Sequence, residues 1–95
     1  MLAFQRKIIE RFKILKGLAK VYVYGSIAKG NYRLDSDIDI AIVTANKKAK
    51  KLATKIANDI YLNEAKLVSL KFFTEKEFKK DLPFILEIKR GRRIV

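Results

Sequence analysis

The stretch Val21–Val43, VYVYGSIAKGNYRLDSDIDIAIV, decides the fold of this chain. It opens with four β-branched and aromatic residues, which is typical of a strand, and Gly25 ends that run. The segment 37–43 predicts a second strand, reached through a polar loop at 31–36. Between the two strands we expect a short helix over residues 26–30.

The second strand carries charge at one end only. Because side chains alternate across a strand, three isoleucines share one face, and two aspartates begin the other face, which then becomes apolar. The first face reads Ile38, Ile40 and Ile42, and the second reads Asp37, Asp39, Ala41 and Val43. The pattern predicts a strand that is buried on both faces, with its carboxylates gathered at the entry end.

The flanking segments predict several helices and one more strand. We expect an amphipathic helix over 3–16 that ends at Gly17, a helix over 47–60, a strand over 66–73, a short helix with Thr74 and Glu77 as its capping box, a helix from Pro83 to about Arg90 before Gly91, and a tail that adds a short edge strand. Together they predict an α/β (α+β) fold in the order αβαβαβα, a small mixed sheet with packed helices, as a single domain over 1–95.

Composition excludes several kinds of chemistry. The chain has 95 residues, 49% of them hydrophobic, which suits one small globular domain. It has no cysteine and no histidine, so disulfides, thiolate nucleophiles, histidine bases and zinc sites built on either residue are excluded. A metal site must therefore use oxygen ligands, which favour Mg²⁺ or Mn²⁺.

Charge and hydropathy indicate where the protein is located in the cell and what kind of partner it binds. No apolar run reaches the length of about 18 residues that a membrane span needs. The first residues, MLAFQRKIIERF, lack the pattern of a signal peptide, so we expect a cytoplasmic protein. The net charge of +12 favours polyanionic partners, although lysines spread over every predicted helix also suit a solvated surface.

Two parts of the deciding stretch predict one site. Carboxylates at positions i and i+2 of a strand project to the same side, with Cα atoms about 6–7 Å apart. Two negative charges at this distance repel each other unless a cation lies beside them. Asp37 and Asp39 therefore predict a metal site. Gly25 lets the backbone approach a phosphate, and Ser26 with the N–H groups of the following helix can donate to it.

The run from Gly25 to Gly30 (GSIAKG), followed by Asp35 to Ile40 (DSDIDI), resembles the signature of the DNA polymerase beta-like nucleotidyltransferases. More narrowly, it resembles the minimal nucleotidyltransferases of archaea and bacteria, and the likeness covers most of the chain. It implies a mixed sheet with packed helices and the transfer of a nucleoside monophosphate, usually AMP from ATP, to an acceptor hydroxyl.

The resemblance also implies roles for particular residues and a partner. Gly25 and Ser26 would bind the nucleotide phosphates, and Asp37 and Asp39 would be the catalytic residues that hold Mg²⁺ (or Mn²⁺). Minimal members often pair with a helical partner protein of the HEPN kind, in systems that look like toxin–antitoxin pairs. An exposed strand edge near the C-terminus would permit a homodimer.

The chain departs from the family pattern at one place. The family has a third carboxylate on the following strand, often the base for the attacking hydroxyl. The third predicted strand here begins KLVSLK, from Lys66, and Ser69 stands about where the acid is expected. Glu64 lies just upstream. A positioned base typically contributes about 10²–10⁴ in rate, so this departure predicts weak activity unless another group replaces it.

Three interpretations remain open on the sequence. The first is a metal-dependent nucleotidyltransferase that acts on a protein or RNA hydroxyl. The second is an antitoxin-like subunit that neutralises a partner by forming a complex. The third, a general nucleic-acid-binding domain, rests on the charge alone, and no aromatic-basic pattern of an RNA-recognition motif accompanies it. The pairing of the Gly-Ser turn with two aspartates favours the first.

Overall fold

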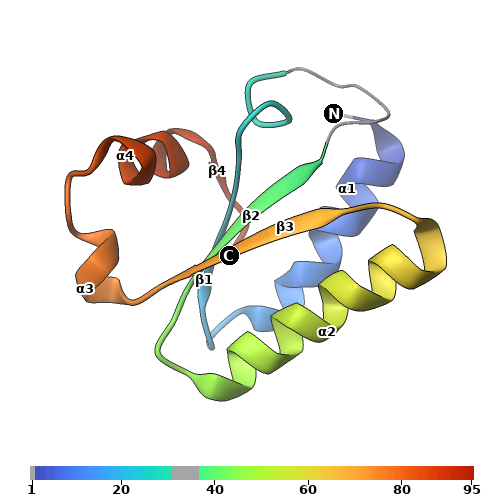
Figure 1. Ribbon diagram of the computed structural model, residues 1–95, viewed down its shortest axis with the longest axis horizontal. Coiled ribbons are helices and arrows are strands. Elements are labelled where there is room, and N and C mark those ends of the chain that lie inside the picture. The colour runs from blue at the N-terminus through green and yellow to red at the C-terminus, as the bar shows by residue number, and fades with distance from the viewer. Residues whose placement is uncertain (1, 31–36) are drawn as a thin grey trace.

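The computed structural model describes residues 2–30 and 37–95. A four-stranded sheet runs through the molecule and has helices on both faces (Figure 1). In chain order the elements are α1 (Ala3–Glu10), the 3₁₀ helix η1 (Arg11–Leu15), β1 (Lys20–Tyr24), β2 (Ile38–Val43), α2 (Lys47–Glu64), β3 (Val68–Phe73), α3 (Glu75–Phe78), α4 (Pro83–Arg90) and β4 (Arg92–Arg93).

The sheet is mixed, as the sequence predicts. Its strands lie in the order β3-β2-β1-β4, so β2 and β1 occupy the centre. β2 pairs antiparallel with β1 and parallel with β3, and the short β4 pairs antiparallel with the outer side of β1. The register places Asp39 opposite Tyr24 on one neighbouring strand and opposite Ser69 on the other.

One face of the sheet carries the larger core. The helices α1, η1 and α2 cover this face, and their apolar residues form one cluster with the inward residues of β1 and β2 (Figure 1). The buried members of that cluster are Ile8, Ile9, Phe12, Leu15, Val21, Val23, Ile27, Ile38, Ile40, Ile42, Ala49, Ala53, Ile56, Ile60 and Val68. All three isoleucines of β2 therefore face these helices.

The opposite face of the sheet carries a smaller core under α3 and α4. Its buried residues are Ala41, Val43, Phe78, Ile85 and Ile88, with Tyr22, Tyr24 and Phe73 packed against them. The rings of Tyr22 and Phe78 lie with their centroids 5.1 Å apart. The predicted burial of β2 on both faces is thus confirmed, because its isoleucines enter one core while Ala41 and Val43 enter the other.

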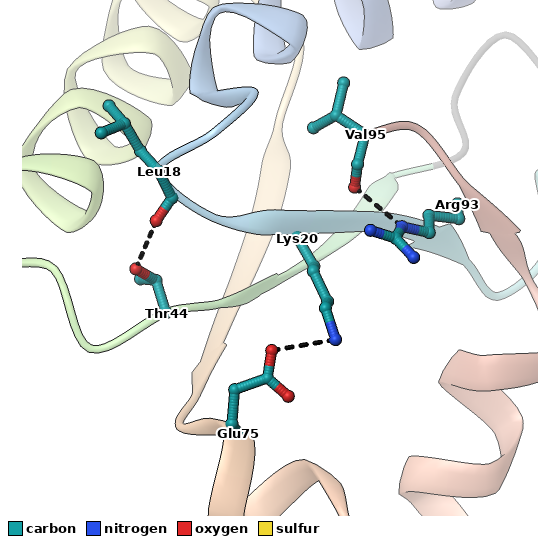
Figure 2. A network of polar contacts seen from close by, with 6 residues as sticks. All are labelled: Leu18, Lys20, Thr44, Glu75, Arg93 and Val95. Carbon is teal, nitrogen blue, oxygen red and sulfur yellow. Dashed lines mark hydrogen bonds and ion pairs between the residues drawn. The ribbon is translucent and has the colours of Figure 1, made fainter.

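Polar contacts stabilise the end of the sheet at which β2 ends. The hydroxyl of Thr44 donates a hydrogen bond of 2.8 Å to the carbonyl of Leu18 (Figure 2). Lys20 forms an ion pair of 3.0 Å with Glu75, which ties the start of α3 to β1. Val21 and the tail also exchange backbone hydrogen bonds, in which Val21 accepts from Ile94 and donates to Val95. Side-chain and backbone contacts therefore stabilise this end of the sheet, whereas Asp39 lies toward the other end.

The local predictions hold with a few corrections. The helix expected over 3–16 is α-helical only to Glu10 and continues as a 3₁₀ helix, and the helix expected over 47–60 extends to Glu64. Thr74 and Glu77 form the predicted capping box, in which each side chain accepts from the backbone of the other. The edge strand expected in the tail is β4. Among the described residues, no helix is both long and apolar enough to cross a bilayer.

The short helix expected over residues 26–30 is a turn. Gly25 and Gly30 both adopt positive φ values, +76° and +88°, which bound the segment with left-handed backbone. Two backbone hydrogen bonds of 3.1 Å close the turn, from the N–H of Lys29 to the carbonyl of Gly25 and from the N–H of Gly30 to the carbonyl of Ile27. Two such bonds of different spacing close a turn and do not build a regular helix, whose first turn is costly to form. Ile27 is buried in the larger core and anchors this turn.

Candidate nucleotide site

The candidate site lies on the α4 side of the sheet, where β2 begins. Side chains of paired residues on neighbouring strands point to the same face. Asp39 therefore stands in a row between Tyr24 of β1 and Ser69 of β3. Asp39 and both of these neighbours are half-buried, and Asp37, just before the strand, is exposed. The sequence pattern located Asp39 correctly at the entry end of a buried strand.

The Gly25 turn and the Asp39 carboxylate are in direct contact. A Cβ atom built on residue 25 would overlap Asp39 Oδ2, and the φ of +76° is a conformation that residues with side chains rarely adopt. Only glycine lets the turn lie this close to the carboxylate. Ser26 follows on the same turn and is half-buried. Gly25, Ser26 and Asp39 thus come together, as expected for one site.

Negative charge gathers around Asp39. Burial raises the pKa of its carboxyl above the usual value, and the nearby charge of Asp37 raises it further. Lys71 acts in the opposite direction, and Glu87 of α4 adds to the rise. Burial, followed by the charges of Asp39 and Glu87, likewise raises the pKa of Tyr24. The charge of Asp37 therefore acts on Asp39, within a field that would favour a bound cation.

A pocket opens beside the turn. It has a volume of about 280 Å³ and lies between the Gly25 turn and α4. Its walls are formed by Gly25, Ala28, Lys29, Pro83, Glu87, Arg90 and Gly91. The amino group of Lys29 forms an ion pair of 3.1 Å with the carboxylate of Glu87 within this wall. The phosphate-binding turn predicted from the sequence therefore borders a cavity of its own.

The comparison with protein families decides what kind of site this is. The model of the polymerase beta nucleotidyltransferase family matches residues 6–94. The chain belongs to this nucleotidyltransferase family. The match includes every element from η1 to β4, and with it the Gly25 turn, both aspartates and the pocket wall on α4. A search among curated proteins found no match.

Solved structures agree with the family assignment. A crystal structure of a protein assigned as a nucleotidyltransferase is 27% identical, with a TM-score of 0.54, over 99% of this chain and 100% of that one. Two toxin–antitoxin structures share the fold over 94% of this chain and 70% of theirs. One, a mutant of MntA–HpeT, is 16% identical with a TM-score of 0.53, and the other, with AMP-PNP, is 20% identical with a TM-score of 0.51.

The residues of this nucleotidyltransferase suit a hard divalent cation. Asp37 and Asp39 offer carboxylate oxygens, which are the ligands that Mg²⁺ and Mn²⁺ prefer. Burial, followed by the charge of Asp37, raises the pKa of Asp39, and a bound cation would offset both effects. Within residues 2–30 and 37–95 no third acidic residue joins the two aspartates closely enough to complete a metal cluster. Asp35 and Ser36 of the signature lie outside the described residues.

Ser69 stands about where the sequence analysis expected a third carboxylate. It lies directly beside Asp39, on the parallel strand β3. Glu64 does not replace it, because Glu64 ends α2, and α2 covers the opposite face of the sheet. Lys66 precedes β3. The row of side chains that contains Asp39 therefore carries a serine, and not a carboxylate, on β3.

Sequence reasoning missed Tyr24 and Glu87. Alternation along β1 would have placed Tyr24 on the face of Asp39 once the antiparallel register was known. Glu87 carried no local signal, because it reaches the site only through the packing of α4 on β1. That packing is close: a Cβ on Gly91, just after α4, would overlap the carbonyl oxygen of Val23.

Proposed function

We propose that this nucleotidyltransferase transfers AMP from ATP to a hydroxyl group on a partner protein, with Mg²⁺ or Mn²⁺ held by Asp37 and Asp39. The contact between Gly25 and the Asp39 carboxylate carries the proposal, because it brings the turn expected to bind phosphate against the strand expected to bind the metal. A neighbouring structure with AMP-PNP supports an adenine nucleotide as the donor.

Each part of the chain has a definite task in this reaction. The acceptor oxygen bonds to the α-phosphorus, the bond from that phosphorus to the bridging oxygen breaks, and diphosphate leaves. The backbone at Gly25 and the Ser26 hydroxyl would bind phosphate oxygens, and the anchoring of the turn by buried Ile27 would hold them in place. When bound, the metal ion would neutralise charge on the phosphates. With Ser69 beside Asp39, the hydroxyl proton would pass to solvent water.

The proposed acceptor is a helical partner protein of the HEPN kind. The support comes from two toxin–antitoxin structures that share this fold over 94% of the chain. The net charge of +12 also favours an acidic partner surface. A basic subunit of this size would bind such a partner rapidly at low salt and more slowly as salt is added.

Label transfer from ATP tests the proposal. The protein is incubated with α-labelled ATP, Mg²⁺ and the product of the adjacent gene, and label is followed on the partner. We expect transfer by the natural protein and none by the double variant Asp37→Asn with Asp39→Asn. A matched control replaces two exposed acids away from the site, Asp81→Asn with Glu10→Gln. No label on the partner at any pH, with an active partner preparation, would refute the proposed transfer.

A second function is favoured by one observation, the serine beside Asp39. Without the third carboxylate, the chain would serve as an antitoxin-like subunit that neutralises its partner by forming a complex. Co-expression of the partner with the Asp37→Asn, Asp39→Asn double variant separates the two functions. Under the enzymatic proposal the variant fails to neutralise the partner, whereas under the binding proposal it neutralises as well as the natural protein.

A further inference from the structure

The first half of α2 concentrates positive charge that the fold leaves largely unpaired. Its lysines are Lys47, Lys48, Lys50, Lys51 and Lys55. Lys50 is half-buried and lies near enough to Glu77 for the two charges to attract each other. Within residues 2–30 and 37–95, the ion pairs involve Lys13, Lys20 and Lys29, and none includes a lysine of α2.

The charges of α2 oppose the dipole of the helix. The N-terminal end of a helix has a partial positive charge and favours acids. The first turn of α2 has no acid, and its two acids, Asp59 and Glu64, lie in the second half of the helix. Lysines four positions apart, such as Lys47 and Lys51, also repel each other. Helix stability therefore does not explain the lysines, whereas a bound anion would offset both effects.

Three of these lysines form a straight row along the outer face of α2. The buried face of the helix consists of Ala49, Ala53, Ile56 and Ile60. Lys47, Lys51 and Lys55 are exposed, and the helical period places them on the face opposite the buried one. Residues four positions apart are separated by about 6 Å along a helix axis. The three positive charges therefore repeat at a regular distance.

A hollow of about 500 Å³ lies along this lysine row. In the described part of the chain, its lining comes from α2 and consists of Lys50, Lys51, Thr54, Lys55, Asn58 and Asp59. Apart from the carboxylate of Asp59, these side chains are cationic or neutral and polar. The surface thus offers donors and positive charge to an elongated anionic ligand.

We propose that the lysine row, Lys47, Lys51 and Lys55, binds the phosphodiester backbone of a single-stranded nucleic acid. In an extended strand, consecutive phosphates lie a comparable distance apart, so each lysine can contact one phosphate. Contacts between lysine and phosphate do not depend on the bases. The binding is therefore independent of base sequence and weakens as salt is added.

An exposed aromatic ring beside α2 favours a single strand over a duplex. Phe72 lies on the edge strand β3 and is 36% exposed. It pairs in the sheet with Ile42, which is buried in the larger core, so Phe72 also points to the α2 side. Residues 44–46 connect the end of β2 to the start of α2, which places Phe72 near the first lysines. An unpaired base can stack on such a ring.

The lysine row is separate from the candidate nucleotide site. It lies on α2, whereas Asp39 lies on the opposite face of the sheet, under α4 (Figure 1). A partner protein that presents a hydroxyl group to Asp39 would dock on the α4 face and leave the outer face of α2 free. The proposed nucleic acid is therefore a second ligand, and its binding does not depend on the proposed transfer of AMP.

Titration of a labelled oligouridylate with the full chain, without ATP or metal, tests the inference by fluorescence anisotropy. The triple variant Lys47→Gln, Lys51→Gln, Lys55→Gln should bind about tenfold more weakly or worse at low salt. The slope of the logarithm of affinity against the logarithm of salt concentration should fall by about 2, as expected for three lost phosphate contacts to a single strand. Unchanged affinity and slope would overturn the proposal.

A matched control separates the lysine row from the net charge of the protein. Lys7→Gln, Lys16→Gln, Lys79→Gln removes the same charge from three exposed positions outside α2. This variant should bind within about threefold of the natural protein with an unchanged salt slope. Equal losses in the two triple variants would show that net charge alone attracts the oligonucleotide, and the lysine row would be refuted.

The identity of the ligand is tested with other probes. Phe72→Leu should weaken binding of oligouridylate about fivefold, and Phe84→Leu, another exposed ring on α4, should not. Equal binding of oligothymidylate would assign recognition to the shared backbone, and weaker binding would add a contact with the 2′-hydroxyl of RNA. Tighter binding of a duplex, or displacement by polyglutamate at equal charge, would overturn the assignment to a single strand.

Thermal unfolding distinguishes a binding role of the lysine row from a structural one. The variant lacking the three lysines should be at least as stable as the natural protein, because repulsion within α2 is relieved. A lower melting temperature would contradict the inference. The double variant Asp37→Asn, Asp39→Asn should bind oligouridylate normally, so a negative label-transfer result would refute the proposed function and leave this inference standing.

Discussion

The Asp39 carboxylate rests on the backbone of Gly25, with no room for a Cβ atom between them. This contact joins the end of β1 to the start of β2 on the α4 face of the sheet. The turn that would bind phosphates and the strand that would bind metal are therefore held in one fixed arrangement, and neither can shift without the other.

Substitution of Gly25 tests this arrangement. In Gly25→Ala the new methyl group displaces Asp39, and the φ of +76° adds strain of about 1–2 kcal/mol. We therefore expect the variant to be less stable by this amount. We also expect it to bind ATP at least about tenfold more weakly in the presence of Mg²⁺. The measurements are denaturant unfolding and calorimetric titration.

Gly17→Ala is the matched control. Gly17 has a similar φ of +84°, but nothing lies within contact distance of an added Cβ. This variant should lose similar stability from backbone strain and bind ATP normally. Equal ATP binding by the two variants would show that the contact of Gly25 with Asp39 does not support the site.

Asp39→Asn should stabilise the metal-free protein at neutral pH. The folded protein raises the pKa of Asp39, mainly by burial. The contribution of this group to stability is therefore fully present below its unfolded value of about 4 and is lost as the pH rises through the folded value. Solvent screens this half-exposed group, so we expect a gain of at most about 1 kcal/mol for the variant near pH 7, vanishing in acid.

Thermal unfolding across the pH range, with and without Mg²⁺, checks the prediction. Mg²⁺ should raise the melting temperature of the natural protein and leave that of Asp39→Asn unchanged. Asp81→Asn, an exposed aspartate between α3 and α4, serves as the control and should respond to Mg²⁺ as the natural protein does. Stabilisation of Asp39→Asn by Mg²⁺ would argue against Asp39 as a ligand.

Ser69→Asp should increase the rate of nucleotidyl transfer. It introduces a third carboxylate directly beside Asp39 on the parallel strand β3. A positioned base contributes about 10²–10⁴ in rate, so an increase of about tenfold or more in labelled partner is expected even with imperfect placement. Asn58→Asp on the exposed face of α2 makes the same change in charge and should have no effect. A slower Ser69→Asp enzyme would contradict the prediction.

Ala65→Gly should stabilise the protein away from the site. Ala65 follows α2 with a φ of +53°, in the left-handed region, and its N–H donates to the carbonyl of Tyr61. Glycine adopts this helix-ending conformation without the strain of a Cβ atom. We expect a gain of about 0.5–1 kcal/mol in the free energy of unfolding, with no change in ATP binding.

Local periodicity was enough to predict the elements that carry the aspartates. The alternation of side chains in β2 predicts which residues face each core, and the structure confirms this assignment. The conformation of residues 26–30 could not be inferred in the same way, because left-handed backbone at Gly25 and Gly30 interrupts the helical pattern. Ligand and metal binding by Gly25, Ser26, Asp37 and Asp39 stay predictions.

The surroundings of the site depend on contacts between distant segments. Glu87 approaches Asp39 because α4 packs on β1, and the sequence separation between them leaves no periodic signal. The Ser69 position was inferred from the family pattern, and the β2–β3 register then placed it beside Asp39. The pocket wall could be found only from the folded chain.

The pairing of β4 with β1 joins residues about seventy positions apart. During synthesis on the ribosome, β1, β2 and β3 all emerge before the segment that forms α4 and β4. A nascent chain can thus align both aspartates while one side of the neighbouring cavity is still missing, and long-range pairing of this kind forms slowly. The wall of the cavity that α4 and Gly91 provide is therefore completed only after the residues of the central strands have been synthesised.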